Sequence, residues 1–205
     1  MSMPPTMSSA AEAGERERLR AEVDRLTGEL EAAQAQVARL EALAHEDELT
    51  GLLNRRGFLR DLHRAIAFAS RYDVSAALLL VDLDAFKPVN DTYGHITGDR
   101  ALRHVAEILR SQVRASDTVA RLAGDEFVLI IWHVDEETAR RKAEALEAAI
   151  AASALVMGAA TLQLSASVGA ALLQADETAD GALARADRAM YGRKRERQAM
   201  MSGVS

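Results

Sequence analysis

Two groups of acidic residues in the sequence could bind a divalent cation. Asp82 and Asp84 end the apolar segment LLLVDLDAF, while Asp125 and Glu126 follow the glycine of RLAGDEF. Residues two apart on a strand point to the same face of a sheet. Carboxylates are the ligands that Mg²⁺ uses together with water and substrate phosphates. The pattern is compatible with a metal site, and also with acidic residues that only end strands and occupy turns.

Two lysines lie near these acidic groups in the pattern and could contact phosphates. Lys87 follows the apolar segment by a few residues, and Lys194 lies at the end of the last predicted helix. The chain has three lysines among its 25 basic residues, so two of the three fall at these places. Solvated surface lysines are the other interpretation of the same spacing.

Composition describes a globular protein and excludes several kinds of site. The 205 residues are 49% hydrophobic and 27% charged, which predicts one domain with an appendage. The absence of cysteine excludes disulfides, thiolate metal sites and a cysteine nucleophile. A formal charge of −6 argues against nucleic acid as a partner. The apolar run 148–160 is shorter than the roughly 18 residues of a membrane span, and the N-terminus has no signal core. We therefore expect a cytoplasmic protein with no membrane contact.

The N-terminal part of the chain carries a heptad repeat. Residues 1–14 are small and polar with two prolines, which predicts a disordered lead-in. Over 15–46, apolar residues alternate at spacings of four and three, with β-branched residues at a and leucine at d, which favours a parallel two-stranded coiled coil. A single amphipathic helix packed on its own domain is the alternative. The repeat comprises Leu19, Val23, Leu26, Leu30, Ala33, Val37, Leu40 and Ala44.

The elements that must position the acidic groups follow from the patterns after residue 46. The segment 75–83 is apolar on both faces, which predicts a central strand. An Ala-Gly-Asp stretch between two later strands predicts a hairpin, with Gly124 at the first central position of its turn. The fold class is therefore α/β (α+β), a sheet flanked by helices. Helices are predicted over 56–71, 99–112, 136–152 and 179–193, and strands over 75–83, 117–122, 126–132 and 162–173, the last as one strand or a pair.

About three quarters of the chain is spanned by five motifs: DELTGLLNRRGF at 47–58, VDLDAFKPVNDTYGHITGD at 81–99, RASDTVARLAGDEF at 114–127, SVG at 167–169 and ADRAMYGRK at 186–194. In this order and spacing, the motifs resemble the GGDEF domain family of diguanylate cyclases. The resemblance implies a palm-like domain over 47–200 and a homodimer joined through the coiled coil. It also implies that two GTP molecules, one on each subunit, are condensed to cyclic di-GMP and two pyrophosphates, with Mg²⁺ or Mn²⁺ as cofactor.

The resemblance assigns roles to the acidic groups. Asp82, the backbone carbonyl of Leu83 and Asp125 would hold the metal ion, which would neutralise phosphate charge. Asp125 and Glu126 are the signature carboxylates, and Asp125 is the candidate for assisting deprotonation of the attacking 3′-hydroxyl. Lys87 would stabilise charge in the transition state.

The resemblance also assigns residues to the bound GTP. Asn90 and Asp99 would recognise the guanine, with His95 near the same nucleotide, Gly124 in the signature turn and Lys194 on the phosphates. A carboxylate can accept hydrogen bonds from guanine N1–H and the 2-amino group, and it would repel the N1 acceptor of adenine.

The segment RASD places Arg114 and Asp117 in the pattern of an inhibitory RxxD site for cyclic di-GMP. An arginine can donate to guanine O6 and N7, and an aspartate can accept from N1–H. An ordinary surface ion pair is the other interpretation. The further arginine that often completes this site cannot be placed in the sequence around Arg140 and Arg141.

Two departures from the family pattern leave a second function open. Ala123 replaces the first glycine of the signature, and Gln198 stands where a phosphate-binding arginine is expected, so that Arg195 or Arg197 would have to substitute. The alternative to an active cyclase is a catalytically silent receptor that binds cyclic di-GMP and signals through its coiled coil.

Overall fold

The computed structural model describes the backbone of residues 7–157 and 160–202, and the side chains of 14–37, 40, 44–156 and 161–195. It divides into two units, Met1–Leu43 and Ala44–Ser205. Across these described ranges, no helix is both long and apolar enough to cross a membrane.

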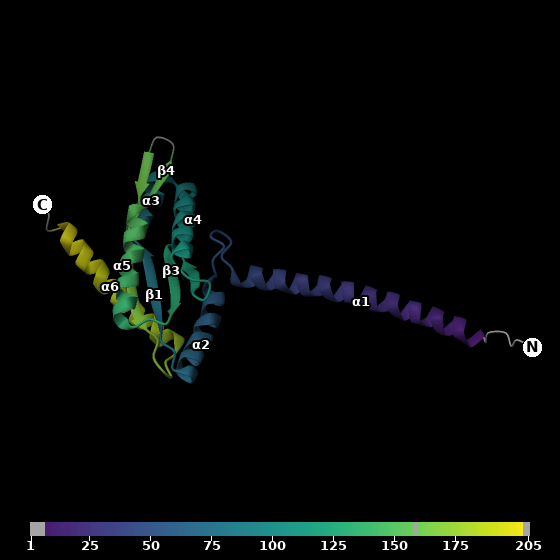
Figure 1. Ribbon diagram of the computed structural model, residues 1–205. Helices are drawn as coiled ribbons and strands as arrows, with labels where there is room; N and C mark the ends of the chain where they lie inside the picture. The colour runs from purple at the N-terminus through teal and green to yellow at the C-terminus, as the bar shows by residue number, and fades with distance from the viewer. Residues whose placement is uncertain (1–6, 158–159, 203–205) are drawn as a thin grey trace, which may run out of the picture. The chain divides into compact units, whose positions relative to one another are not determined.

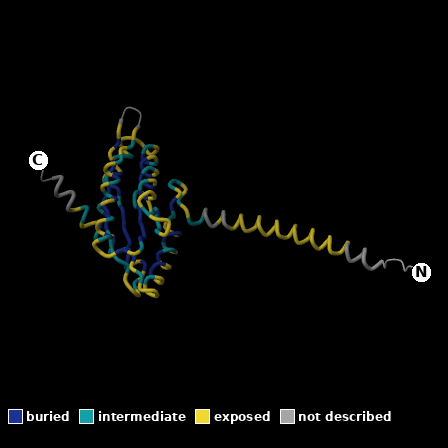
Figure 2. Tube along the Cα trace, viewed as in Figure 1, coloured by how far each residue is buried: buried dark blue, intermediate teal, exposed yellow. Residues whose placement is uncertain are grey.

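The N-terminal unit is formed by helix α1 (Met7–His45). It begins at Met7, so the helix includes part of the segment 1–14 that the sequence predicted as a disordered lead-in, and residues 1–6 lie outside the described range. Its described side chains between 14 and 37 are exposed (Figure 2). Arg25 pairs with Glu22 and Glu29 one turn away on either side, which stabilises the helix locally. The larger heptad side chains are 49–60% exposed: Leu19, Val23, Leu26, Leu30, Val37 and Leu40.

The second unit contains a four-stranded antiparallel sheet with the order β2-β3-β1-β6. The apolar segment at 75–83 forms a central strand, as predicted, with Val81 opposite Phe127 on one side and Val168 on the other. A separate hairpin pairs β4 with β5. The strands are β1 (Ala76–Leu83), β2 (Thr118–Ala123), β3 (Glu126–Trp132), β4 (Ala154–Met157), β5 (Ala160–Gln163) and β6 (Ala166–Leu172).

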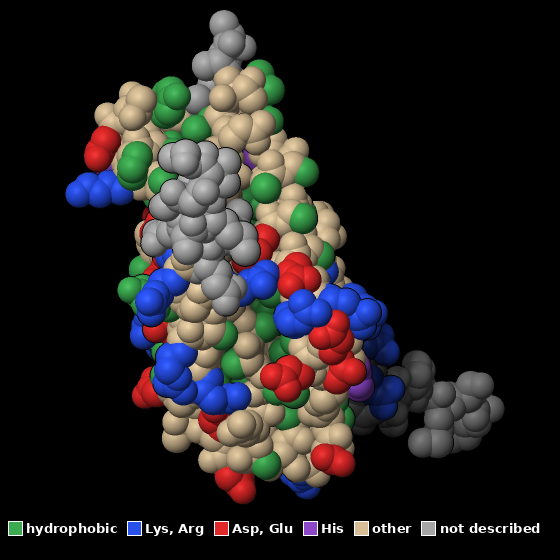
Figure 3. Space-filling model, turned by 90° about the vertical axis from the view of Figure 1, so that its left-hand side faces the viewer, with side chains coloured by type: hydrophobic (Ala, Val, Ile, Leu, Met, Phe, Trp, Pro, Cys, Tyr) green, Lys and Arg blue, Asp and Glu red, His purple; other side chains and the backbone are tan. Residues whose placement is uncertain are grey.

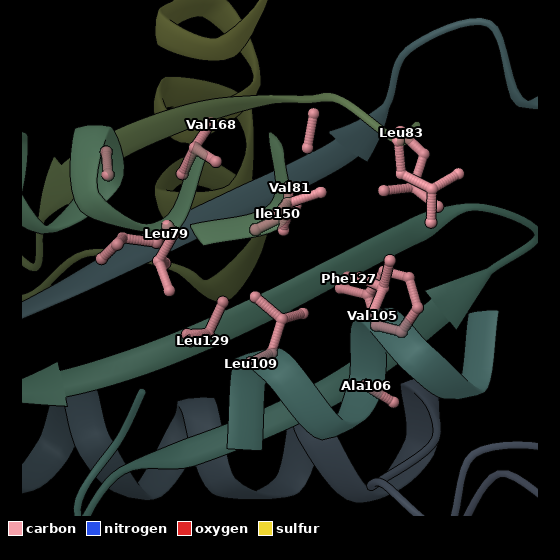
Figure 4. Packing of buried hydrophobic residues seen from close by; sticks show 14 of the residues in the cluster. Leu79, Val81, Leu83, Val105, Ala106, Leu109, Phe127, Leu129, Ile150 and Val168 are labelled. Atoms are coloured by element: carbon pink, nitrogen blue, oxygen red, sulfur yellow. The ribbon is translucent and has the colours of Figure 1, made fainter. Parts of the chain in front are cut away.

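Helices cover both faces of this sheet. Helices α4 and α5 pack on the face made by Leu79, Val81 and Phe127 (Figure 4), whereas α2 and α6 pack on the face made by Leu78 and Val128 (Figure 1). Successive strand residues point to opposite faces of the sheet, and helices cover both faces. Strand β1 is therefore buried on both sides, which explains why its sequence is a continuous apolar run. The helices are α2 (Arg55–Tyr72), α3 (Phe86–Tyr93), α4 (His95–Ser111), α5 (Glu136–Ala152) and α6 (Ala179–Ser202).

The predicted elements are present, with differences at their ends. Helix α4 begins at His95, four residues before the predicted start, and α6 continues past the predicted end at 193. The predicted strand at 162–173 is two strands, since β5 ends at Gln163 and β6 begins at Ala166. Helix α3 and strand β4 were not predicted, because one is a short helix containing Pro88 and the other is part of an apolar run without alternation.

Two polar side chains begin helices and explain why these helices start where they do. Asn54 accepts a hydrogen bond from the Gly57 N–H at 3.0 Å and begins α2, while its amide donates to the carbonyls of Ala44 and Glu46. Asp135 begins α5 in the same way, by accepting from the Thr138 N–H at 2.8 Å. Such caps satisfy amide groups that have no partner within the helix.

Candidate active site at the end of the central strand

Three carboxylates gather where β1 meets the β2–β3 hairpin. Asp82 lies directly opposite Glu126 in the antiparallel register, and the Leu83 N–H donates to the Asp125 carbonyl at 3.3 Å. The N–H and C=O of a strand residue point to the same neighbour, so the Leu83 carbonyl is also directed at the hairpin. Like charges placed directly opposite each other destabilise a sheet. This end of the sheet therefore favours the binding of a cation.

Lys194 supplies one positive charge to this group. Its Nζ donates to Oδ1 of Asp82, and the two side chains are 30% and 16% exposed. Partial burial lowers the pKa of Lys194, but the hydrogen bond to Asp82 and the charges of Asp82, Asp84 and Asp125 outweigh burial and raise that pKa above its usual value. The lysine is therefore fully charged at neutral pH, and the structure confirms that it lies beside the acidic group.

Close packing of α6 on β6 brings Lys194 to this place. A Cβ added at Gly169 would lie 2.2 Å from the backbone nitrogen of Met190 and 2.3 Å from the carbonyl oxygen of Ala186. Only glycine allows so close an approach of helix and strand. One turn of α6 beyond Met190 is Lys194, so the glycine of the SVG motif determines how near this lysine comes to the sheet.

The residue before Lys194 ties α6 to α5. Arg193 contacts Glu144 at 3.5 Å and Glu147 at 3.2 Å, and Glu147 also accepts a hydrogen bond from the Val168 N–H at 2.9 Å. Figure 3 shows acidic and basic side chains side by side on this face of the domain. These contacts join α5, α6 and β6, which holds the helix that carries Lys194.

The two hairpin carboxylates are electrostatically unfavourable in their ionised forms. Burial raises the pKa of Asp125, and the charge of Asp82 raises it further, against the opposing charges of Lys194 and Arg121. Burial also raises the pKa of Glu126, together with the charges of Asp82, Asp125 and Asp187. A bound divalent cation would offset this electrostatic cost by stabilising the charged oxygens.

The donor set fits a hard divalent cation such as Mg²⁺ or Mn²⁺. Asp82 and Asp125 offer carboxylate oxygens and Leu83 a backbone carbonyl, which are the ligands that such ions take in proteins. Among the described side chains, no three acidic or histidine residues are already arranged as a metal site. Lys194 contacts the Oδ1 oxygen of Asp82, so the ion would share this carboxylate with the lysine or replace it there.

The signature turn has the backbone that its glycine allows. Gly124 has a φ of +49°, as expected for the first central residue of the hairpin turn, whereas Ala123 does not have a positive φ. Alanine therefore replaces glycine at position 123 without backbone strain of this kind. Its side chain is exposed, next to Gly124 at the surface.

Arg121 anchors the hairpin and was not found by sequence reasoning. Its Nε donates to the Gly124 carbonyl at 2.9 Å, and its Nη1 contacts both carboxylate oxygens of Asp47 at 3.1 and 3.2 Å. Although burial raises the pKa of Asp47, hydrogen bonds from Thr50 and Arg121 hold it below the usual value. In the sequence, Asp47 begins the motif DELTGLLNRRGF and Arg121 lies in the motif RASDTVARLAGDEF. Neither motif indicates that the two residues contact each other.

The structure gives Asp84 partners on the opposite side of β1 from the hairpin. Its carboxylate accepts hydrogen bonds from the hydroxyls of Ser165 at 3.0 Å and Ser167 at 2.8 Å. Ser167 is fully buried, and it is the first residue of the SVG motif. Asp84 thus joins β1 to the beginning of β6, and its charge also acts on Lys194.

The residues predicted to recognise the guanine lie on α3 and α4, whereas Gly124 and Lys194, also predicted to bind GTP, lie in the β2–β3 turn and on α6. Asn90 and Asp99 are half-buried, and the Asn90 Oδ1 lies only 1.9 Å from where a Cβ at Gly98 would be. Gly98 thus makes room for the Asn90 side chain beside the residue that precedes Asp99. His95 is exposed at the start of α4, and Lys87 is exposed on α3. The structure does not bring Lys87 into an ion pair with any described side chain.

The RASD segment forms a closed turn before β2. Asp117 accepts from the Arg114 N–H at 3.0 Å and from the Trp132 N–H at 3.3 Å, while its own N–H donates to the Arg114 carbonyl. The Arg114 side chain is exposed, and the described partners of the Asp117 carboxylate are backbone N–H groups rather than the Arg114 guanidinium. A pocket of about 510 Å³ lies at this turn and includes Arg110.

A lysine of α5 lies in the electrostatic field of the RASD turn. Lys142 donates to the carbonyl of Gln112, and burial lowers its pKa, while the charges of Asp117 and Arg114 act on it in opposite directions. Arg140 and Arg141, considered in the sequence for this place, pair with Glu137 on the same helix. Arg195 lies on α6 with an exposed side chain, whereas the side chains of Arg197 and Gln198 lie outside the described range.

Known proteins of similar sequence share the region that contains this site. Residues 44–200 match the sequence model of the family described as diguanylate cyclase, GGDEF domain. The bifunctional diguanylate cyclase/cyclic di-GMP phosphodiesterase MucR of Pseudomonas aeruginosa is 51% identical over 104 residues, which are 51% of this chain and 15% of that protein. Diguanylate cyclase DosC of Escherichia coli is 41% identical over 104 residues, 51% of this chain and 23% of that protein. The matched region is thus less than a quarter of either relative.

Solved structures resemble the chain over most of its length. The coiled coil and GGDEF domain of DgcB from Caulobacter crescentus, in complex with c-di-GMP, has a TM-score of 0.79 at 29% identity and covers 87% of this chain and 95% of that chain. Diguanylate cyclase SiaD of Pseudomonas aeruginosa, in complex with its activator SiaC, has a TM-score of 0.74 at 30% identity and covers 93% of this chain and 74% of that chain.

Proposed function

Because the chain belongs to the GGDEF domain family of diguanylate cyclases, we propose that it condenses two GTP molecules into cyclic di-GMP and two pyrophosphates. The observation that carries the proposal is the meeting of Asp82, Asp125, Glu126 and Lys194 at one end of the sheet, inside the region matched to the family. Carboxylates that would hold a metal ion beside a lysine for phosphate are what phosphoryl and nucleotidyl transfer require.

Asp82, the Leu83 carbonyl and Asp125 hold Mg²⁺ or Mn²⁺ in this proposal. The ion supplies neutralisation of phosphate charge and lowers the pKa of a hydroxyl bound to it. Lys194, which contacts Asp82 in the structure, would contact a phosphate of the bound GTP. Asp125 is the carboxylate proposed to accept the proton of the 3′-hydroxyl, because it would lie at the metal site beside that hydroxyl.

The guanine is recognised between α3 and α4. Asn90 and Asp99 offer an amide and a carboxylate within half-buried surroundings, and a buried acceptor left without a partner penalises adenine strongly. Gly98 supports this arrangement, because any side chain there would displace Asn90. His95 and Lys87 lie at the exposed border of the same two helices, where Lys87 stabilises developing charge.

Two subunits are needed, since each GTP attacks the other across the dimer. The heptad side chains of α1 support a coiled-coil homodimer, because leucine and valine side chains that are about half exposed form a continuous stripe. Product feedback at Arg114 and Asp117 is supported by the exposed guanidinium and the pocket beside the turn. A ligand that binds there either leaves the hydrogen bonds between Asp117 and the backbone in place or breaks them.

A silent receptor for cyclic di-GMP is the second candidate function. Ala123 at the exposed signature turn favours it, since a methyl group stands there in place of hydrogen. In that case the turn at Arg114 and Asp117 is the only ligand site that matters, and α1 transmits the signal.

The experiment that separates these functions begins with protein stripped of nucleotide. It is incubated with GTP and Mg²⁺, and the products are identified by mass spectrometry. The cyclase predicts cyclic di-GMP with two pyrophosphates per product, lost in Asp125→Ala. The control Asp180→Asn removes an exposed carboxylate about 20 Å from Lys194 along α6 and should retain turnover. A dimeric protein that binds cyclic di-GMP but yields no product would support the receptor.

A further inference from the structure

An aromatic pocket of about 480 Å³ lies between α2 and the end of β3. Phe68 and Trp132 line it, with ring centroids 5.6 Å apart and planes nearly perpendicular. Phe68 is 48% exposed, so part of its side chain is open to solvent at this pocket. Arg64 also lines the pocket, so flat apolar faces and a guanidinium occur together.

This pocket is continuous with the surface at the RASD turn. Asp61, Ser116 and Thr118 line both the aromatic pocket and the pocket that contains Arg110 and Arg114. The two pockets are also connected by a hydrogen bond, because the Trp132 N–H donates to the Asp117 carboxylate. The turn therefore separates one half of the surface that contains two arginines, Arg110 and Arg114, from an aromatic half.

A ligand that fits both halves carries negative charge and at least one flat ring. Guanidinium groups bind phosphate and the edges of guanine, and aromatic side chains stack on the faces of bases. A cyclic dinucleotide has two phosphates and two bases, so one base and a phosphate can occupy the turn while the other base reaches the aromatic half. An acidic peptide would satisfy the arginines but would leave the aromatic faces unused.

We propose that one guanine of cyclic di-GMP stacks on the aromatic side chains of Phe68 and Trp132, while the rest of the same molecule binds at Arg114 and Asp117. The inference rests on the proposed function, because the reaction at the carboxylates supplies this ligand. It extends the feedback site to residues that lie 46 positions before the RASD turn and 15 positions after it.

Trp132 is the only tryptophan in the chain, so its fluorescence reports on this pocket alone. It lies six residues beyond Glu126 along β3, or about 20 Å from the proposed catalytic end of the sheet. Titration of the full-length, nucleotide-free protein with cyclic di-GMP should quench this fluorescence saturably, because a stacked purine contacts the indole. Inorganic pyrophosphate, which carries phosphate without a base, should leave it unchanged.

A matched pair of variants tests the stacking contact. Phe68→Leu retains apolar bulk but removes the aromatic face, and should weaken the calorimetric affinity for cyclic di-GMP by about 5- to 140-fold. Tyr191→Leu removes an exposed aromatic ring on α6 that lines neither of the two pockets, and should leave the affinity unchanged. Thermal unfolding of both variants shows whether the domain is intact.

The outcomes separate this inference from the proposed function. Cyclic di-GMP that binds by calorimetry without quenching Trp132, or an affinity that Phe68→Leu leaves intact, would overturn the stacking site even if GTP is converted to product. Saturable quenching with weakened binding in Phe68→Leu upholds the site, even in a protein that makes no product and acts only as a receptor.

Discussion

The close contact between Gly169 and α6 makes a sharp prediction. In Gly169→Ala, the new methyl group would lie 2.2 Å from the Met190 nitrogen and 2.3 Å from the Ala186 oxygen, both of them backbone atoms. Carbon atoms do not approach such atoms within 3.0 Å, so α6 must move outward by roughly 0.8 Å or more. Adding a methyl group to a packed interior costs about 1–3 kcal/mol of unfolding free energy.

The same displacement should affect catalysis through Lys194, one turn further along α6. A shift of about 1 Å in a catalytic group can reduce the rate about 100-fold. We therefore expect Gly169→Ala to lower the midpoint of thermal unfolding by about 2–4 °C for each kcal/mol lost, and to reduce GTP turnover by about two orders of magnitude. Circular dichroism and a pyrophosphate-release assay measure the two effects on the same preparation.

Gly192→Ala is the matched control for this experiment. It places a methyl group on the same helix where nothing lies within 4 Å. Alanine is the better helix former, so this variant should gain up to about 1 kcal/mol and retain its activity. If Gly169→Ala unfolds at the same temperature as the unaltered protein and turns over GTP at the same rate, the contact does not position α6 and the reasoning is refuted.

Three further predictions concern charge, assembly and feedback. Burial and the charge of Asp82 raise the pKa of Asp125 in the folded state, so folding is less favourable once pH rises above the unfolded value of about 4. Asp125→Asn should therefore unfold at a higher temperature than the unaltered protein at pH 7, and this difference should be lost below about pH 4. Mg²⁺ should raise the unfolding temperature of the unaltered protein only. Unfolding temperatures that depend on pH in the same way in both proteins would contradict this prediction. Replacing Leu26 and Leu40 by lysine should give monomers by light scattering and remove most activity, because charges enter the heptad seam; a dimeric variant would exclude α1 as the dimer contact. Arg114→Ala should relieve inhibition by added cyclic di-GMP in steady-state assays, and an unchanged inhibition curve would remove this arginine from the feedback site.

Local patterns explain how much of the fold could be predicted from sequence. The apolar run of β1, the glycine of the hairpin turn and the helix at Glu136–Ala152 each depend on residues close together in the chain. Elements whose ends depend on packing were placed less well. Helix α4 begins at His95, directly after Gly94. Strand β4 was not predicted because its sequence does not alternate between apolar and polar residues, and only its pairing with β5 defines it as a strand.

The candidate site was found in outline because its motifs are contiguous. The sequence itself determined that Asp82 lies near the end of a strand, that Asp125 and Glu126 lie at a hairpin turn, and that Gly124 allows this turn, since these are properties of neighbouring residues. Only the tertiary structure decided that Lys194 contacts Asp82 across 112 positions and that Arg121 joins Asp47 across 74. Contacts of this kind depend on how helices pack on the sheet, and the space that Gly169 leaves beneath α6 has no signature in local sequence. The joining of Phe68 and Trp132 in one pocket has the same origin, because a helix and a strand distant in the chain meet only when the core is formed.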